Sequence, residues 1–250
     1  MTAAKERVTA GIVVVGDEIL SGRTKDQNIG VIAERLTELG IDLKEVRVVA
    51  DQEAAIIEAV DALRARLTYV FTTGGIGPTH DDITADAIAK AFGVPIDIDP
   101  RAVRLMAEYY KGRNLALTDA RLRMARIPAN AMLILNSISS APGFMLGNVI
   151  VMAGVPGIMR AMLDDATRHL RRGPRKESHI ICVDHPESEI AELLRAHAAE
   201  FADVAMGSYP QTKNGRWTTE LVLRSPDHAR LEAAVDGLRV KLREQGLKVG

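Results

Sequence analysis

The chain has 250 residues, of which 47% are hydrophobic and 26% are charged, and its formal net charge is −1. This composition supports a packed core in one large domain, or in one medium and one small domain, and excludes a disordered chain. The near-zero charge gives no electrostatic reason to expect a nucleic-acid or membrane partner. The single cysteine, Cys182, excludes an internal disulfide and a metal cage made of cysteines.

No apolar stretch approaches the ~20 residues that a membrane-spanning helix needs. The N-terminal sequence MTAAKERVTAG lacks the apolar segment of a signal peptide. We therefore expect a soluble, cytoplasmic protein.

Short apolar runs alternate with amphipathic segments over residues 1–172. Strands are predicted at 9–15, 43–49, 69–71, 132–135 and 149–153. Helices are predicted at 28–39, 51–67, 83–92, 100–111 and 119–126, and in the segment that leaves through 154–159 and runs to 170. This alternation predicts an α/β domain with a mostly parallel sheet.

Residues 171–176, RRGPRK, are charged and contain both glycine and proline, which predicts a linker between domains. The pattern that follows predicts a strand at 178–183, a helix at 186–200, strands at 203–208 and 216–224, and a helix at 227–245. Residues 176–250 thus form a small α+β domain of βαββα type. Because they contain no GxxG loop of the kind by which KH domains bind RNA, we expect a structural or interface-forming role.

The stretch TTGGIGPTHDDITAD, residues 72–86, joins a predicted buried strand to a predicted helix. Gly74, Gly75 and Gly77 allow the backbone to approach a ligand closely, and loop N–H groups above a helix N-terminus favour anions. Asp81 and Asp82 either cap the helix or form a site for a hard cation. Phosphate-binding N–H groups beside metal-binding carboxylates suit phosphoanhydride chemistry, but without a Walker lysine a simple tight turn is the alternative.

Three other predicted strands also end in polar or glycine-rich segments, at residues 16–18, 139–144 and 154–157. In parallel sheets, ligands bind outside the carboxyl ends of the strands. We therefore expect these three segments to meet residues 73–82 at one edge of the sheet, around a phosphate-bearing ligand.

Several blocks of the sequence, taken in order, resemble the molybdopterin-binding-like domain of the CinA (competence/damage-inducible protein) family, whose relatives include MogA and MoaB of molybdenum-cofactor synthesis. The blocks are GDEILSG (16–22), DQN (26–28), TTGGIGPTHDDITADA (72–87), IP (127–128), Asn136, APGF (141–144) and GVPGIM (154–159). The resemblance covers roughly residues 8–172, and residues 207–210 resemble the small domain that follows in CinA. It implies a three-layer α/β/α fold whose loops hold a pterin phosphate or a dinucleotide-like pyrophosphate.

The central stretch departs from the cofactor-synthesis branch of this family. That branch has a motif similar to GGTG, three residues, then Arg-Asp-any-Thr, so that its Asp and Thr match Asp82 and Thr84. Ile76 stands for the first threonine and Asp81 for the arginine. Losing a phosphate-binding cation and gaining a carboxylate disfavours a molybdopterin transferase and favours a metal-assisted hydrolase. The resemblance to CinA implies divalent-metal-dependent hydrolysis of ADP-ribose or a related pyrophosphate such as FAD.

The candidate site residues follow from these motifs. We expect Asp82 and Asp81 to be catalytic, and Asp17, Glu18 and Asp82 to bind Mg²⁺, Mn²⁺ or Co²⁺. The candidate substrate-binding residues are Gly16, Asp26, Asn28, Thr73, Gly74, Gly75, Gly77, Thr84, Ser139, Ser140, Gly143 and Pro156.

Each role has a structural alternative. Asp82 can be a helix cap, Asp81 a solvated neighbour, and Glu18 a brace for its own loop. Asp26 and Asn28 can cap the next helix, and the serines with Gly143 can form an ordinary turn. His80 either contacts the ligand or is simply exposed.

Three functions remain open: a metal-dependent nucleotide pyrophosphatase as the leading hypothesis, a molybdopterin-binding protein or transferase, and a non-catalytic ligand-binding module. Full-length CinA also carries a C-terminal deamidase of nicotinamide mononucleotide. No such sequence follows Gly250 here, so we expect no amide hydrolysis of that nucleotide.

The apolar content, together with the oligomers that the resembled family forms, predicts a homo-oligomer. A homodimer is the simplest case, because two-fold assemblies are the commonest. Light scattering at micromolar concentration should therefore give twice the 27.1 kDa mass of one chain. A mass of 27.1 kDa would show that the prediction is wrong.

Overall fold

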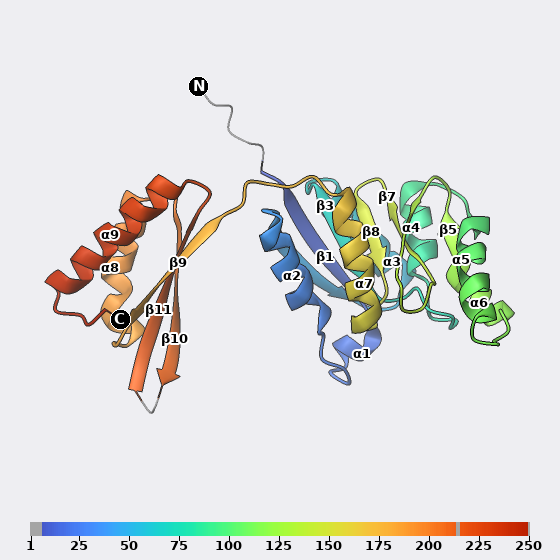
Figure 1. Cartoon of the computed structure of the whole chain (residues 1–250), viewed down its shortest axis with the longest axis horizontal. Coiled ribbons are helices and arrows are strands. Elements are labelled where there is room, and N and C mark those ends of the chain that lie inside the picture. The colour runs from blue at the N-terminus through green and yellow to red at the C-terminus, as the bar shows by residue number, and fades with distance from the viewer. Residues whose placement is uncertain (1–6, 214–215, 250) are drawn as a thin grey trace, which may run out of the picture. The chain divides into compact units, whose positions relative to one another are not determined.

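Six strands form the main sheet in the order β2-β1-β3-β8-β7-β6 (Figure 1). They are β1 (Thr9–Val15), β2 (Asp42–Val49), β3 (Tyr69–Thr73), β6 (Met132–Ile134), β7 (Gly143–Leu146) and β8 (Val149–Met152). Strands β2, β1, β3 and β8 pair in parallel, whereas β7 is antiparallel to both β8 and β6. The predicted mostly parallel sheet is confirmed.

The computed structural model describes residues 7–213 and 216–249. The chain divides into two compact units, Met1–Gly173 and Pro174–Gly250. Among the described residues, no helix is long and apolar enough to cross a membrane.

Helices cover both faces of the six-stranded sheet. Helices α2 (Asn28–Glu38) and α7 (Pro156–Ala166) pack on one face, and α3 (Glu53–Arg64), α4 (Thr84–Phe92) and α5 (Pro100–Lys111) belong to the cluster on the other. Successive side chains of a strand point to opposite faces, so that Ile12 and Val13 of β1 enter different clusters. The predicted three-layer α/β/α fold is confirmed.

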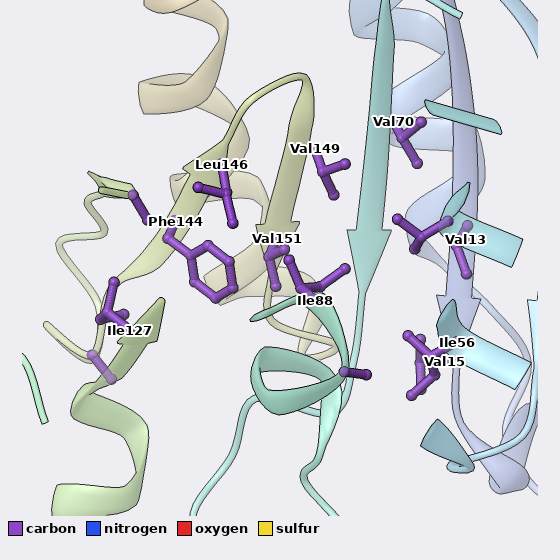
Figure 2. Close-up of a cluster of buried hydrophobic side chains, with 14 of the residues drawn as sticks. Val13, Val15, Ile56, Val70, Ile88, Ile127, Phe144, Leu146, Val149 and Val151 are labelled. Atoms are coloured by element: carbon purple, nitrogen blue, oxygen red, sulfur yellow. The ribbon is translucent and has the colours of Figure 1, made fainter. Parts of the chain in front are cut away.

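The strands contribute mainly β-branched side chains to the core cluster on the α3–α4 face (Figure 2). Val13, Val70 and Val151 come from three neighbouring strands, and Ile88 of α4 and Phe144 of β7 pack against them. Branched side chains suit the pleated surface of a sheet because they fill the space between strands with few rotamers to lose.

The antiparallel strand β7 was not predicted: residues 143–144 were assigned to the glycine-rich segment 139–144, and no strand was expected between residues 135 and 149. Gly147, with φ 56°, and Asn148 form a two-residue turn between β7 and β8. The Asn148 amide donates to the carbonyls of Arg64 and Leu67, both at 3.0 Å, and so ties the turn to the end of α3. A Gly-Asn pair between two apolar runs is a hairpin signal that identifies this strand in retrospect.

An excursion between α4 and β6 was only partly predicted. Strands β4 (Ile96–Ile98) and β5 (Arg126–Pro128) pair antiparallel around α5 and α6 (Asp119–Leu122). The predicted helix at 119–126 is therefore wrong in its second half, which is the 3-10 turn η1 (Arg123–Ala125) and the start of β5. A single helical turn, α1 (Asp17–Leu20), was also not predicted. Pieces this short carry no readable periodicity.

The smaller unit has the predicted βαββα order. It consists of β9 (Glu177–Val183), α8 (Glu187–Glu200), β10 (Ala205–Lys213), β11 (Arg216–Ser225) and α9 (His228–Glu244). The strands form an antiparallel sheet in the order β10-β11-β9. Fully buried His197 of α8 bonds the Ala234 carbonyl of α9 at 2.8 Å, which links the two helices.

The first residues of the predicted linker follow a short 3-10 turn, η2 (Thr167–His169), and are hydrogen-bonded to the larger unit. The N–H of Arg171 donates to the Tyr69 hydroxyl at 2.8 Å, and the N–H of Gly173 donates to the Leu39 carbonyl at 3.0 Å. A Cβ on Gly173 would lie 1.9 Å from the Gly40 carbonyl oxygen, so this approach requires glycine.

Phe71 of β3 is fully buried at the centre of the larger unit. Phe71→Ala should lower the free energy of unfolding by about 3–5 kcal/mol, because it removes buried surface and leaves a cavity. Urea titration followed by circular dichroism measures the change. Ile98→Ala on β4, where the side chain is 45% exposed, is the control and should cost less than about 1 kcal/mol. Equal effects of the two substitutions would contradict the packing described above.

Candidate active site

The carboxyl ends of β1, β3 and β8 lie side by side, because the register pairs Val14 with Thr73 and Thr73 with Met152. A cavity of about 380 Å³ opens there. All four segments that were expected to meet contribute to its wall, through Gly16, Glu18, Gly74, Gly75, Gly77, Asp81, Asp82, Ser139, Ala141, Pro142, Gly154 and Val155. This size and position are typical of a small-molecule site in an α/β domain.

Gly74 and Gly75 close the central loop against the protein itself. Their φ angles are 100° and 66°, in the left-handed region. A Cβ on Gly74 would lie 2.2 Å from the Val15 carbonyl oxygen, and one on Gly75 would lie 2.1 Å from the Thr84 hydroxyl. Glycine is thus required for loop closure. Gly75 also lines the cavity, so its close approach to a ligand stays a prediction beside this internal role.

The closed loop leaves backbone donors available at the cavity. Within the described residues, the N–H groups of Gly75, Ile76 and Gly77 donate to no other protein group. Across the cavity, α7 begins after Val155 with no side chain bonded to its first turn, and both Val155 and Ile158 line the wall. Free loop N–H groups and an uncapped helix N-terminus attract anions.

Four carboxylates surround the same cavity: Glu18, Asp51, Asp81 and Asp82. No Lys, Arg or His is among the described residues that line it. Burial raises the pKa of Asp51, and the nearby carboxylates of Asp17, Glu18 and Asp81 raise it further, against a bond from the Asp17 N–H at 2.9 Å. Carboxylates that repel one another in this way are stabilised when a cation binds between them.

Asp82 closes its loop and does not cap α4. Its Oδ2 accepts from the Thr79 N–H at 2.8 Å and from the Thr79 hydroxyl. The N-cap residue of α4 is Ile83, and no side chain bonds the first turn of that helix. Helix capping, the alternative reading for Asp82, is therefore wrong, and Asp81 does not cap the helix either. Asp82 also lies against Gly77, where a Cβ would be 2.6 Å from Oδ2.

Asp26 and Asn28 hold the start of α2 and do not line the cavity. The Asp26 carboxylate accepts from the N–H groups of Asn28, at 3.0 Å, and Ile29, at 2.7 Å. The buried Asn28 amide donates to the Gly154 carbonyl at 2.8 Å. Asp26 thus has the capping role that was its alternative. The Asn28 side chain does not cap the helix and instead positions the loop that precedes α7.

The other predicted residues divide into two sets. Gly16 and Ser139 line the cavity, and the Ser139 N–H donates to Asn136 Oδ1 at 2.8 Å. The remaining candidates lie outside the wall: Asp17, Thr73, Thr84, Ser140, Gly143 and Pro156. His80 also lies outside it, with a side chain that is 100% exposed.

Asp51 is the main site residue that sequence analysis missed, since it was assigned only to the start of a helix. It follows the end of β2 by two residues, so the rule that ligands gather at strand ends identifies it. Met124, from the turn η1, also lines the cavity and was missed. It belongs to the excursion between α4 and β6, whose path no local pattern reveals.

The predicted metal ligands do not form a ready-made cage. Among the described residues, no group of three or more His, Cys, Asp or Glu side chains is arranged to hold a metal ion. Mg²⁺ commonly binds one or two carboxylates together with substrate phosphates. The carboxylate oxygens of the cavity wall suit a hard cation bound in that manner, and Glu18 and Asp82 remain candidate ligands.

Two family models match the chain in sequence. Residues 11–172 match the probable molybdopterin-binding domain, and residues 177–249 match the middle domain of FAD synthase. A protein of Aeropyrum pernix is 35% identical over 83% of this chain and 81% of its own length. A probable FAD synthase of Caenorhabditis elegans is 31% identical over 94% of this chain, which spans 50% of that protein.

Among solved structures, CinA from Thermoplasma acidophilum is similar, with a TM-score of 0.60 and 34% identity over 65% of this chain and 98% of that one. Residues 11–172, which match the family model, contain the glycine loop and the carboxylates. The chain belongs to the family of probable molybdopterin-binding domains, and within it to the CinA-like members.

Proposed function

We propose that the cavity hydrolyses the pyrophosphate bond of a dinucleotide such as FAD or ADP-ribose, with the help of a divalent cation, to give two monophosphates. One observation carries the proposal: the cavity is lined both by loop residues whose N–H groups bond no other described group and by four residues with carboxylates, and its described wall has no basic side chain.

The charge of the wall explains why a cation is needed. Phosphate groups attracted by the N–H groups of Gly75–Gly77 would meet the repulsion of Glu18, Asp51, Asp81 and Asp82. Two like charges 4 Å apart cost roughly 4 kcal/mol near a protein surface, which no single N–H group offsets. A divalent cation bound beside the carboxylates would offset this repulsion and favour the ionised form of Asp51.

The residues of the wall divide the work. Glu18, Asp81, Asp82 and Asp51 are the available oxygen ligands, and the bound cation would polarise a phosphoryl oxygen and lower the pKa of a water molecule. The N–H groups of Gly75 to Gly77 would stabilise the charge that accumulates on phosphate. Met124, Val155 and Ile158 form an apolar side for a base or ring.

The comparisons favour a flavin dinucleotide among the possible substrates. The smaller unit matches the middle domain of FAD synthase, and the similarity to the C. elegans probable FAD synthase extends over both units. FAD therefore stands first in a substrate panel, followed by ADP-ribose, NAD and CoA.

The second candidate is binding of a molybdopterin phosphate without hydrolysis, which the description of the matched family favours. Asp81 stands where the cofactor-synthesis branch resembled above has an arginine, which weakens this candidate. AMP release from the panel with Mg²⁺, Mn²⁺ or Co²⁺ separates the two. AMP release that a chelator abolishes supports hydrolysis. Molybdopterin binding without AMP release, for every combination of substrate and metal, would leave only the second candidate. The absence of both AMP release and molybdopterin binding would contradict both candidates.

Asp82→Asn tests the catalytic carboxylate. Asparagine retains an oxygen that accepts from the Thr79 N–H, so the free energy of unfolding should change by less than about 1 kcal/mol. Metal-dependent AMP release should fall by on the order of 10² or more, because a key charge is lost. Asp119→Asn, on α6 and outside the cavity wall, is the matched control. Full activity of Asp82→Asn would remove Asp82 from the mechanism.

Asp51→Asn tests the repulsion in the wall. The pKa of Asp51 is raised in the folded state, so its protonated form stabilises the fold and ionisation at rising pH reduces that stability. Without metal at pH 7, Asp51→Asn should melt at the same temperature as the unmodified protein or higher, and the difference should shrink as Asp51 protonates in acid. Mg²⁺ should raise the melting temperature of the variant less. Lower metal-free stability together with an unchanged Mg²⁺ effect would show that the carboxylate is structural.

A further inference from the structure

A small hollow adjoins the cavity and shares part of its wall. Gly75–Gly77, Asp82, Met124 and Pro142 line both. The exposed donors of the loop backbone therefore lie between two recesses, and only the second has basic side chains, Arg123 and Arg126.

The two arginines differ in their partners. Arg126 forms an ion pair with Asp86 of α4 through one Nη atom, while its buried Nε has no partner among the described residues. Arg123 is exposed at the start of η1, and within the described residues its side chain has no ion pair or hydrogen bond. It is next in sequence to Met124, which lines both recesses. Arg123 is thus a cation at the edge of the site whose charge no neighbour neutralises.

The main cavity has four carboxylates and no basic side chain in its described wall, so a diphosphate there needs positive charge from outside that wall. A guanidinium binds phosphate through two parallel N–H bonds, which gives it both strength and orientation. Arg123 lines the hollow beside the glycine loop. Glu18 and Asp51 do not line this hollow, so they do not compete with a phosphate for the Arg123 guanidinium.

We infer that Arg123 binds one phosphoryl group of the ligand, so that the site selects a diphosphate over a monophosphate. The other phosphoryl group is held by the carboxylate-bound cation. This inference rests on the proposed function, which supplies the cation. It adds a residue that determines specificity, and that residue lies on the 3-10 turn η1 between α4 and β6.

Calorimetric titration with ADP, inorganic pyrophosphate and AMP, each with Mg²⁺, tests the inference on Arg123→Gln, Arg123→Lys and the unmodified protein. Arg123→Gln should weaken ADP and pyrophosphate binding by about tenfold to a hundredfold, as expected for a lost charged hydrogen bond. AMP binding should change by less than about threefold, and lysine should restore part of the loss. Arg104→Gln, which removes an exposed charge of α5 outside both recesses, is the matched control.

The kinetic readout separates binding from folding and from chemistry. With a dinucleotide that the protein hydrolyses, Arg123→Gln should raise KM far more than it lowers kcat, and the melting temperature should match that of Arg104→Gln. Equal losses for AMP and ADP, equal behaviour of the two glutamine variants, or no binding of any probe by the unmodified protein would overturn the inference. Selective loss of diphosphate binding without AMP release from any dinucleotide would support Arg123 and reject the hydrolase.

Discussion

The approach of Gly74 and Gly75 to their neighbours is the constraint on which the site depends. Gly74 lies against the carbonyl of Val15 at the end of β1, and Gly75 lies against Thr84 at the start of α4. Because no larger residue fits either position, the loop after β3 has one closed path across the sheet edge. That path exposes the N–H groups of Gly75 to Gly77 and places Asp81 and Asp82 beside the carboxylates that follow β1 and β2.

The cavity wall contains groups that attract anions and groups that repel them. Backbone donors and the uncapped start of α7 favour anions, whereas the four carboxylates oppose them. Burial raises the pKa of Asp51, and the neighbouring carboxylates of Asp17, Glu18 and Asp81 raise it further. Functional sites often retain such destabilising repulsion in the free protein because ligand binding reduces it. Here positive charge is needed to reduce the repulsion between the carboxylates and a phosphate, and its two proposed sources are a divalent cation and Arg123.

Most of the larger unit could be predicted from sequence because its strands are continuous apolar runs and its helices are amphipathic. The cavity wall followed from the same pattern, since residues that end parallel strands meet at one edge. Asp51 was missed because a helix start explained it equally well. Met124 and Arg123 could not be found locally, because a pair of three-residue strands, β4 and β5, brings them to the site. Asp26 and Asn28 were assigned to the ligand on motif alone. In the structure they lie outside the cavity wall, where Asp26 bonds the start of α2 and Asn28 bonds the Gly154 carbonyl.

The Gly147–Asn148 turn lies at the end of the sheet opposite the cavity. There, one asparagine amide satisfies two carbonyls at the end of α3, and no carboxylates crowd together. The two edges of the sheet therefore have different roles, since one stabilises the fold and the other forms the cavity. Changes near the turn can adjust thermal tolerance with little effect on substrate choice, while changes around the glycine loop act the other way. A lineage of this chain could thus adapt to a hotter habitat and to a new ligand through separate sets of residues.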